Sequence, residues 1–403
     1  MPSARVDLSV RIFGRTLPNP LIVASGPNVK NDDDIVKCLS RGAAGVVTKT
    51  ITFDRMQQVQ PKPRMYVVHE DALARGGFYS FYSVDLMSEY APERWATMLR
   101  RAKIEAERRG LDGLIIASIA GRSYEEWERL AELVASAEAS AIEVNVSCPH
   151  IEPGTALMGR AAAADPEVVK SILKVVKGAA KGLPVIGKIT PHGANPIVLA
   201  KAMKEGGADA VVSTARFQGL IIDVETLQPV MWGGYGGYGG PWQLPISLAW
   251  TSQIAREGLG IPIIGSGGIS SGEDMARFIL VGAHAVQVCT SILLHGFSHI
   301  ERMLNELRAW MERKGFASLD EFRGLALKKI KSLKQLNREK LFRVEIGSNC
   351  RLCGKCAEVC PYGALRVEGG AVIVDEEHCD NCGLCLWICP FDAVSARPLA
   401  NPA

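Results

Sequence analysis

The sequence has no apolar stretch that approaches membrane-spanning length, and its first residues, MPSARVDLSVRIFGRT, contain no apolar signal core. These two absences predict a cytoplasmic protein without a membrane span. The net charge is only +3 at pH 7, which is too small to indicate a nucleic-acid-binding protein. One local excess of basic residues runs from Lys328 to Lys340, and it indicates either a solvated helix face or a docking surface for an acidic partner.

A further absence concerns dinucleotide binding. No G-x-G-x-x-G motif followed by a helix is present, so the chain shows no module of its own for NAD or FAD. Its 403 residues are 47% hydrophobic and 22% charged, a composition that suits a soluble enzyme. That length allows a large domain with an extensive core together with a small one.

Cysteine is the residue type with the most informative pattern. Eight of the eleven cysteines form two runs with the spacing C-x2-C-x2-C-x3-C-P. This spacing is typical of proteins with two 4Fe-4S clusters, in which three thiolates of one run and the last thiolate of the other hold each cluster. Zinc usually takes two well-separated ligand pairs, and disulfides need an oxidising compartment, so both alternatives are disfavoured. The predicted ligands are Cys350, Cys353, Cys356 and Cys360 in the first run, and Cys379, Cys382, Cys385 and Cys389 in the second.

Ahead of these runs, short apolar segments alternate with helical patterns. Eight such units predict a parallel sheet buried on both faces, and hence an α/β fold of the (β/α)8 barrel type. A doubly wound open sheet is the alternative, but it would normally show the glycine-rich fingerprint after its first strand. The expected strands are 21–24, 45–49, 114–118, 142–146, 185–189, 210–213, 263–265 and 286–288. The expected helices are 32–40, 92–109, 124–137, 166–179, 196–205, 246–256, 273–280 and 297–314.

The domain organisation follows from these patterns. We predict the barrel over residues 1–314 and a basic helical connector over 315–345. A small α+β ferredoxin-like domain with two 4Fe-4S clusters would occupy residues 346–398, with a short strand at 371–374, and residues 399–403 would form a loose tail.

The ends of the last two predicted strands favour a phosphate site, because barrels place their chemistry where the strands end. One strand ends at Gly265-Ser266-Gly267-Gly268-Ile269, and the other continues into Cys289-Thr290-Ser291. Glycines that let backbone N–H groups approach, together with hydroxyl groups, suit the phosphate of a flavin mononucleotide. Ordinary glycine turns are the alternative.

Two lysines, Lys49 and Lys188, also end predicted strands. A lysine at such a position is costly to bury unless a charge or a dipole meets it. The edge of a flavin ring would meet it, and so would a neighbouring carboxylate.

The fourth predicted strand continues into Asn145-Val146-Ser147-Cys148-Pro149-His150. A thiol has a reference pKa of about 8.5, so it can donate a proton at neutral pH and take one back, as a general acid beside a hydride donor must. We therefore predict that Cys148 is the catalytic acid rather than a buried apolar cysteine. His150 is a weaker candidate, and Cys38 and Cys289 are interpreted as structural.

Taken together, these motifs resemble the flavin-containing half of dihydropyrimidine dehydrogenase, whose barrel is similar to that of dihydroorotate dehydrogenase. The resemblance extends from about residue 5 to residue 398. The motifs that carry it are Asn145 to His150, Val47 to Thr50, Lys188 to Pro191, Tyr235 to Gly237, Gly267 to Ile269 and Gln287 to Cys289.

The resemblance implies an FMN site, a substrate site and a partner. Asn145 and Ser147 would hold the substrate ring, and Cys148 would protonate the carbon next to the one that takes hydride. A partner subunit with FAD and NAD(P) would pass electrons through the two 4Fe-4S clusters to FMN, in a homodimer or a heterotetramer. The flavin ring would contact Ala24, Ser25, Lys49, Thr50 and Lys188, and its phosphate end would lie near Gly236, Gly267, Gly268, Thr290 and Ser291.

The sequence departs from the family on the substrate side. Ala215 and Arg216 replace an Asn-Thr pair after the sixth strand, and Ser83-Val84-Asp85-Leu86-Met87 replaces an Asn-x-Glu-x-Ile element. Asparagine pairs with a neutral amide, whereas arginine offers only donors, in a fork that suits a carboxylate or a phosphate. We therefore hypothesise an anionic substrate bound by Arg216, with Ser83 and Asp85 nearby. A structural ion pair and a contact to the flavin phosphate remain alternatives.

These observations lead to one preferred function and two alternatives. We expect an oxidoreductase acting on CH–CH bonds, which reduces or re-forms a C=C bond conjugated to a carbonyl in a pyrimidine-like ring or an anionic analogue. The loop at residues 151–165 is expected to close over the substrate. The alternatives are a dihydroorotate dehydrogenase and an electron-transfer subunit, in which FMN only joins two-electron and one-electron carriers. The latter would need no proton donor beside the flavin.

Overall fold

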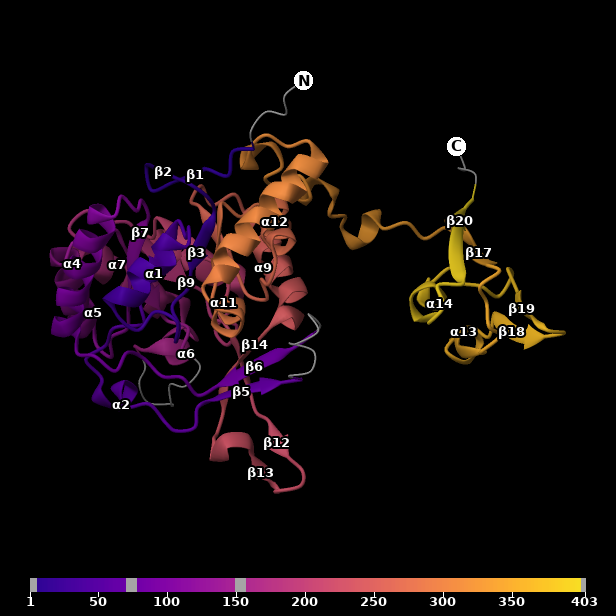
Figure 1. Cartoon of the computed structure of the whole chain (residues 1–403), viewed down its shortest axis with the longest axis horizontal. Coiled ribbons are helices and arrows are strands. Elements are labelled where there is room, and N and C mark those ends of the chain that lie inside the picture. Colours follow the sequence, from indigo (N-terminus) through magenta and orange to yellow (C-terminus); the bar gives the residue numbers. More distant parts are fainter. Residues whose placement is uncertain (1–5, 70–77, 149–156, 400–403) are drawn as a thin grey trace. The chain divides into compact units, whose positions relative to one another are not determined.

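The computed structural model describes residues 6–69, 78–148 and 157–399. The chain forms two compact units, Met1–Lys329 and Ile330–Ala403 (Figure 1). The first unit is built around a closed barrel of parallel strands in the order β3-β4-β7-β8-β9-β10-β15-β16, and β16 pairs with β3 to close it. This architecture confirms the predicted (β/α)8 barrel and rules out the doubly wound open sheet.

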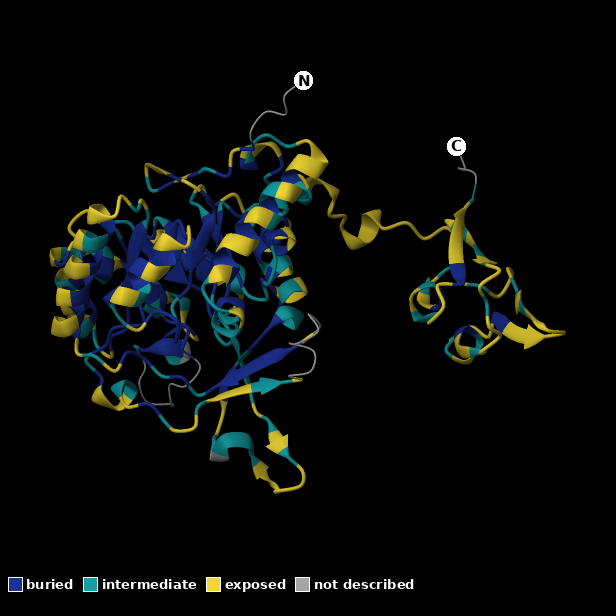
Figure 2. Ribbon diagram, viewed as in Figure 1, coloured by how far each residue is buried: buried dark blue, intermediate teal, exposed yellow. Residues whose placement is uncertain are grey.

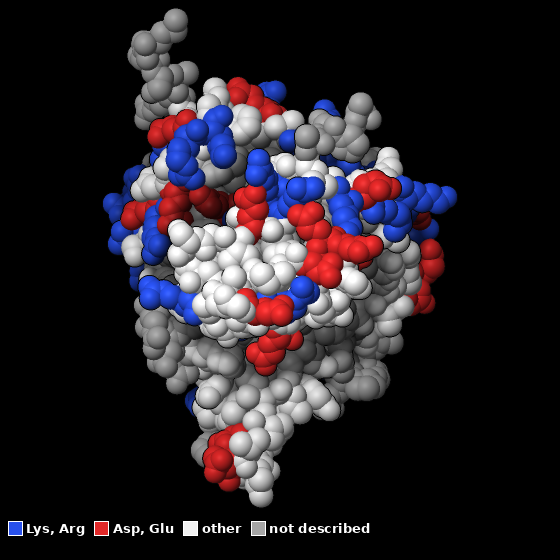
Figure 3. All heavy atoms as spheres, turned by 90° about the vertical axis from the view of Figure 1, so that its right-hand side faces the viewer, with Lys and Arg blue, Asp and Glu red and all other residues white. Residues whose placement is uncertain are grey.

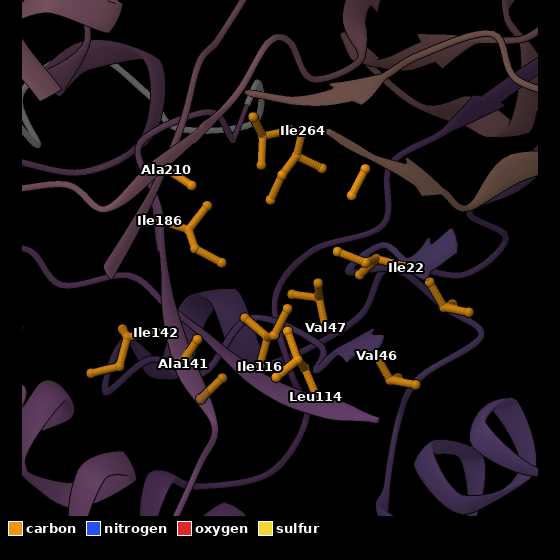
Figure 4. Packing of buried hydrophobic residues seen from close by; sticks show 14 of the residues in the cluster. Ile22, Val46, Val47, Leu114, Ile116, Ala141, Ile142, Ile186, Ala210 and Ile264 are labelled. Carbon is orange, nitrogen blue, oxygen red and sulfur yellow. The ribbon is translucent and has the colours of Figure 1, made fainter. Parts of the chain in front are cut away.

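The barrel strands are those that the sequence predicts, each within two residues of the expected bounds. Their side chains fill the interior. Ile22, Ile116, Ile186 and Ile264 come from alternate strands and point toward one another (Figure 4), as expected for one packed layer of a barrel. The strands are β3 (Leu21–Val23), β4 (Gly45–Val47), β7 (Leu114–Ile119), β8 (Ala141–Asn145), β9 (Val185–Lys188), β10 (Ala210–Val212), β15 (Ile263–Ser266) and β16 (Ala285–Val288).

Helices surround the barrel and turn their apolar faces toward it (Figure 2). Several begin at strong local signals: the side chains of Asn31, Ser123 and Asp165 cap α1, α5 and α7. Proline stands in the first turn of α4, α7 and α8, where its missing N–H costs nothing. The long helices are α1 (Asp32–Ser40), α4 (Pro92–Arg108), α5 (Tyr124–Ser136), α7 (Pro166–Ala179), α8 (Pro196–Glu205), α9 (Leu244–Arg256), α10 (Gly272–Leu280) and α12 (Ser298–Lys314). Short helices are α2 (Arg55–Gln58), α6 (Gly159–Ala162) and α11 (Thr290–His295).

A second sheet, which the sequence analysis did not foresee, joins two distant loops of the barrel. It is antiparallel, with the order β11-β14-β6-β5, and it pairs the segment after β4 with the segment after β10. Its strands are β5 (Met65–Val68), β6 (Ser80–Ser83), β11 (Phe217–Gly219) and β14 (Gly236–Gly239). Smaller additions are the hairpin β1 (Val10–Ile12) with β2 (Arg15–Leu17), the hairpin β12 (Ile222–Asp223) with β13 (Gln228–Pro229), and the 3-10 turns η1 (Val230–Trp232) and η2 (Pro241–Gln243).

The predicted helical connector at 315–345 is wrong in its secondary structure. The helical elements of residues 315–341 are the short 3-10 turns η3 (Leu319–Glu321), η4 (Leu327–Lys329) and η5 (Leu333–Gln335). Gly315 ends α12 in a left-handed conformation, and Leu319 and Phe322 then pack into the core of the barrel unit. Every residue from Lys328 to Leu341 is exposed, so no packing surface supports a helix there.

The second unit is small and of the α+β class. Strand β17 (Phe342–Ile346) pairs with β20 (Val394–Pro398), β18 (Leu365–Glu368) pairs with β19 (Ala371–Val374), and α13 (Lys355–Glu358) and α14 (Leu384–Ile388) are short. The predicted strand at 371–374 is therefore confirmed as β19.

The hydropathy of the helices and the distribution of surface charges are two further features of the described residues. None of the helices combines the length and the hydropathy that crossing a membrane requires. On the face shown in Figure 3, lysine and arginine side chains are interspersed with acidic ones, in keeping with the small net charge.

Candidate functional site

A cavity lies at the carboxyl ends of the barrel strands. It contains about 1150 Å³ of space outside protein atoms, counting the part that opens to solvent. Residues that follow different strands line it, which is where barrels carry their active sites. Most of the predicted site residues are in this lining: Ala24, Ser25, Lys49, Thr50, Asp85, Asn145, Ser147, Cys148, Lys188, Ala215, Arg216, Gly267, Gly268, Thr290 and Ser291.

Two predicted residues lie outside the lining. Ser83 ends β6 and reaches the site through a hydrogen bond to Arg216. Gly236 lies on β14, where an added Cβ would meet Tyr82 and the carbonyl of Ser83, so the structure places it in the second sheet and not among the glycines of the cavity.

The loop after β15 has the properties of a phosphate cradle. Gly267 and Gly268 have φ values of 99° and 83°, in the left-handed region that favours glycine. An added Cβ would lie 2.3 Å from Gln243 Nε2 at the first position and 2.3 Å from the backbone nitrogen of Leu244 at the second. Within the described residues, the buried hydroxyl of Ser291 has no hydrogen-bond partner. A ligand with several acceptor oxygens would satisfy this hydroxyl and the loop N–H groups.

Lys188 belongs to a buried polar triad at the base of the cavity. Its ammonium group lies 3.3 Å from Glu143 Oε1 and donates to Gln287 Oε1 at 2.8 Å. Gln287 Nε2 in turn donates to Glu143 Oε2 at 2.6 Å, and Glu143 is completely buried. Sequence reasoning missed Glu143 and Gln287, although a polar residue between apolar neighbours in a predicted strand is a usable signal for such a triad.

Lys49 is also paired with a carboxylate. It forms a close ion pair with Asp85, whose other oxygen lies 3.4 Å from Arg64 Nε. Burial lowers the pKa of Lys49, and the carboxylate of Asp85 opposes this shift. Lys49 and Lys188 thus each have a carboxylate partner, which the sequence analysis gave as the alternative to a flavin contact. Both lysines nevertheless line the cavity.

A chain of hydroxyl and amide groups crosses the floor of the site. Asn145 Nδ2 donates to Thr50 Oγ1 at 2.8 Å, and Asn145 Oδ1 accepts from the backbone N–H and the hydroxyl of Ser147. Thr50 Oγ1 also lies 3.3 Å from Ser25 Oγ. This network fixes the orientation of Asn145 and leaves one of its amide hydrogens for a ligand.

The three cysteines of the barrel unit occupy different environments. Cys148 is 8% exposed and lines the cavity directly after β8, beside Ser147. Cys38 lies in the apolar core, where burial raises its pKa to about 12, in keeping with a structural role. Cys289 also lines the cavity, and its thiol lies 3.4 Å from Asn28 Oδ1. His150 and residues 151–156 of the expected closing loop lie outside the described residues.

The cysteines of the second unit form two four-membered sets, each around its own cavity of about 320–330 Å³. Each set combines three cysteines of one run with the last cysteine of the other, which is the grouping that the spacing predicts for two 4Fe-4S clusters. The described part of the chain holds no tighter grouping of His, Cys, Asp or Glu side chains suited to a single metal ion. One set is Cys350, Cys353, Cys356 and Cys389, and the other is Cys360, Cys379, Cys382 and Cys385.

Comparison with known proteins relates these features to families. Residues 7–311 match the dihydroorotate dehydrogenase family, and residues 349–393 match the 4Fe-4S dicluster domain. The chain is 32% identical over 381 residues to the NAD-dependent dihydropyrimidine dehydrogenase subunit PreA of Escherichia coli (strain K12), an alignment that covers 93% of this chain and 90% of that protein.

Two further relatives align with a smaller part of this chain. The catalytic subunit of dihydroorotate dehydrogenase B (NAD(+)) of Pyrococcus furiosus is 32% identical over 323 residues, which are 80% of this chain and 100% of that protein. The chloroplastic dihydropyrimidine dehydrogenase (NADP(+)) of Arabidopsis thaliana is 29% identical over 335 residues, 80% of this chain and 77% of that protein.

The two matched ranges fall within the two compact units. The predicted barrel with a C-terminal ferredoxin-like domain is therefore confirmed, as are the resemblance and the assignment to oxidoreductases acting on CH–CH bonds. The chain belongs to the dihydroorotate dehydrogenase family, with a 4Fe-4S dicluster domain following its barrel.

Proposed function

We propose that this chain is an FMN-dependent oxidoreductase that reduces, or re-forms, a C=C bond conjugated to a carbonyl in a pyrimidine-like ring or an anionic analogue. The observation that carries the proposal is the set of residues that line a single cavity. It combines a glycine cradle, two buried lysines and two cysteines, contributed by the ends of different strands and by the loops that follow them. The names of the relatives, which include dihydropyrimidine and dihydroorotate dehydrogenases, support a pyrimidine-like substrate.

The residues present fit FMN. Gly267, Gly268 and Ser291 offer backbone N–H groups and an unpaired hydroxyl for the phosphate, with Thr290 beside them. Lys49, Lys188 and the Ser25–Thr50 hydroxyl pair would hold the ring system. FMN bound there would supply a hydride donor or acceptor.

The protein's own groups would handle the substrate and its proton. Asn145, oriented by Thr50 and Ser147, would bind the ring through its remaining amide hydrogen. Cys148 would give a proton to the substrate carbon next to the one that takes hydride, or remove it in the reverse direction. Tyr79 and Phe81, both buried in the wall of the cavity, would exclude water from the reacting atoms.

The second unit would carry single electrons. Two 4Fe-4S clusters in its cysteine cavities would exchange electrons with a partner subunit that binds FAD and NAD(P). The names of two relatives, an NAD-dependent subunit and a catalytic subunit, support such a partner and an assembly of more than one chain. Clusters held by thiolates also favour a cytoplasmic location, where thiols are kept reduced. A pure electron-transfer subunit is disfavoured, because it would need neither Cys148 nor a substrate cavity.

Anaerobic reduction of the protein-bound flavin tests this proposal directly. Dihydrouracil, dihydrothymine, dihydroorotate and anionic analogues would be added one at a time to the oxidised protein, and the visible flavin absorbance followed. We expect at least one of them to bleach the flavin. Bleaching by dithionite but by none of these compounds would contradict the proposed substrate class.

A further inference from the structure

Three cationic side chains line the active-site cavity, and two of them have a carboxylate partner. Lys49 is paired with Asp85, and Lys188 is paired with Glu143. Arg216, the third, makes no ion pair with any residue that the structure describes. A partly buried guanidinium without an anion is unfavourable, so the cavity is electrostatically incomplete until a ligand supplies a negative charge.

The structure holds Arg216 firmly in this position. Its Nη1 donates to Ser83 Oγ at 2.6 Å. The guanidinium lies against β14 at Gly237, where an added Cβ would come within 2.6 Å of Arg216 Cζ. Gln243 Nε2 donates to the carbonyl of Ala215 at 2.9 Å, which fixes the backbone just before Arg216. Gly237 and Gly239 of β14 thus form a shelf for the arginine side chain, and the shelf exists because these two residues have no side chains.

Most of the hydrogen-bonding capacity of Arg216 is still available. A guanidinium carries five N–H donors, and the described residues accept from one of them. Its fork matches a carboxylate through two parallel hydrogen bonds. A neutral amide edge, which offers one donor and one acceptor, would leave the charge of Arg216 uncompensated.

Arg216 contacts the second sheet through its guanidinium group, and Gln243 links its backbone to the phosphate cradle. The guanidinium contacts Ser83 and Gly237, while Gln243 Nε2 donates to the Ala215 carbonyl and lies 2.3 Å from the position of a Cβ added at Gly267. The positive charge of Arg216 adds to the burial that lowers the pKa of Lys49 and opposes the burial that raises the pKa of Cys289, so the guanidinium is within electrostatic reach of both. Because the glycine loop and the Ser291 hydroxyl offer the phosphate its own donors, we assign the unused donors of Arg216 to a second anion.

We propose that the substrate carries a carboxylate and that Arg216, held by Ser83 over Gly237, is the residue that selects it. This inference rests on the proposed function, because it names the substrate class of the same cavity. Among compounds with a C=C bond conjugated to a carbonyl, the site prefers those with a carboxylate near the reacting ring or chain. Neutral counterparts of the same shape bind more weakly.

Ligand binding to the oxidised, flavin-loaded protein tests the proposal without turnover. Perturbation of the flavin spectrum yields dissociation constants for two matched pairs, orotate with orotamide and cinnamate with cinnamamide. We expect at least one carboxylate to bind roughly 10-fold to 100-fold tighter than its amide, as a charge-assisted bidentate pair allows. In Arg216→Gln that preference should fall to about 3-fold or less, with the flavin content unchanged.

Two further variants and a control complete the test. Gly237→Ala places a methyl group against Arg216 and should weaken carboxylate binding while barely changing amide binding. Ser83→Ala should do the same to a smaller degree. Arg11→Gln removes an exposed arginine on β1 and should change neither constant.

Several outcomes would overturn the inference. Loss of FMN from Arg216→Gln would make Arg216 a phosphate anchor, and equal weakening of both members of a pair would make it a structural residue. Absence of any preference for a carboxylate in the unaltered protein would also reject it. If dihydrouracil still bleaches the flavin in that case, the proposed function stands and only the carboxylate assignment falls. A purified protein that contains no flavin would contradict both the proposed function and the carboxylate assignment.

Discussion

The two compact units differ in what holds them together. The barrel unit has an apolar core that draws on all eight barrel strands and the long helices around them. The buried cluster of the second unit consists of Cys356, Leu365, Cys385 and Val394, and two of these four residues are predicted cluster ligands. Domains this small usually need metals or disulfides in addition to their apolar burial. If the proposed cofactors are present, we expect the barrel to fold as a scaffold for FMN and the second unit to depend on its clusters for its fold.

The largest expected effect is therefore the loss of the second unit on removal of iron. Anaerobic chelation, or the double variant Cys356→Ser with Cys385→Ser, should reduce amide hydrogen-exchange protection in β17 and β20 to nearly that of an unfolded chain. Strands β7 to β9 of the barrel should keep their protection and serve as the internal control. Persistent protection of β17 and β20 in iron-free protein would show that the unit folds by apolar burial alone.

The second prediction concerns the chemistry of the barrel. Cys148→Ser should lower turnover on the order of 10²-fold to 10⁴-fold, because a hydroxyl is a much weaker acid than a thiol. FMN and iron contents should not change. Cys289→Ser is the matched control, since this thiol lines the same cavity but lies beside Asn28 and has a pKa raised by burial. Equal turnover of the two variants would contradict the proposed role of Cys148 as the general acid.

The phosphate cradle allows a finer test of how the barrel holds its cofactor. Gly267→Ala combines a left-handed backbone with a Cβ placed 2.3 Å from Gln243 Nε2. Strain and overpacking of about 1–3 kcal/mol should weaken FMN binding by roughly 5-fold to 150-fold, as measured by the dissociation constant of the flavin. Gly258→Ala is the control, because it has a φ of 61° and nothing within 4 Å of the added Cβ. Comparable weakening by both substitutions would locate the effect in backbone strain and not in the cradle.

The smallest expected effect is a pH dependence of barrel stability. Burial, and next the charge of Arg323, lowers the pKa of His284 from 6.5 to about 4. The unfolded chain therefore binds more protons than the folded one between these values. The contribution of neutral His284 is fully present above pH 6.5 and is lost as the pH falls toward 4. The urea midpoint of the barrel should decrease from pH 7 to pH 5, and His284→Asn should show a smaller decrease. An identical pH dependence in the two proteins would mean that other groups cause it.

The two units also differ in how far their sequence predicts them. The predicted cluster ligands follow from local spacing, because all four members of each run lie within eleven positions. The barrel strands follow from their apolar runs. The sequence does not predict which polar residues of the cavity pair with each other. Glu143 and Gln287 are 144 residues apart, and Lys49 and Asp85 are 36 apart. Closure of the barrel brings Glu143 of β8 to Gln287 of β16, and the segment that carries β5 and β6 brings Asp85 back to Lys49.

The second sheet illustrates the same limit. Strand β14 has the sequence GGYG, which lacks the alternation of apolar and polar residues that marks a strand. It forms because Ser83 and Tyr82 of β6 offer backbone partners from a distant loop. The contact between Arg216 and the glycines of β14 could therefore not be predicted. Arg216 itself, however, stands out in the sequence as a departure from the family. The basic connector failed for a different reason, since its helical pattern has nothing to pack against.

The most direct test of the account is a cofactor analysis of the full-length protein purified without air. The account predicts one FMN and about eight iron atoms per chain, the content of a flavin-loaded barrel and two 4Fe-4S clusters. Iron without flavin, flavin without iron, or a single zinc ion in place of the clusters would contradict it.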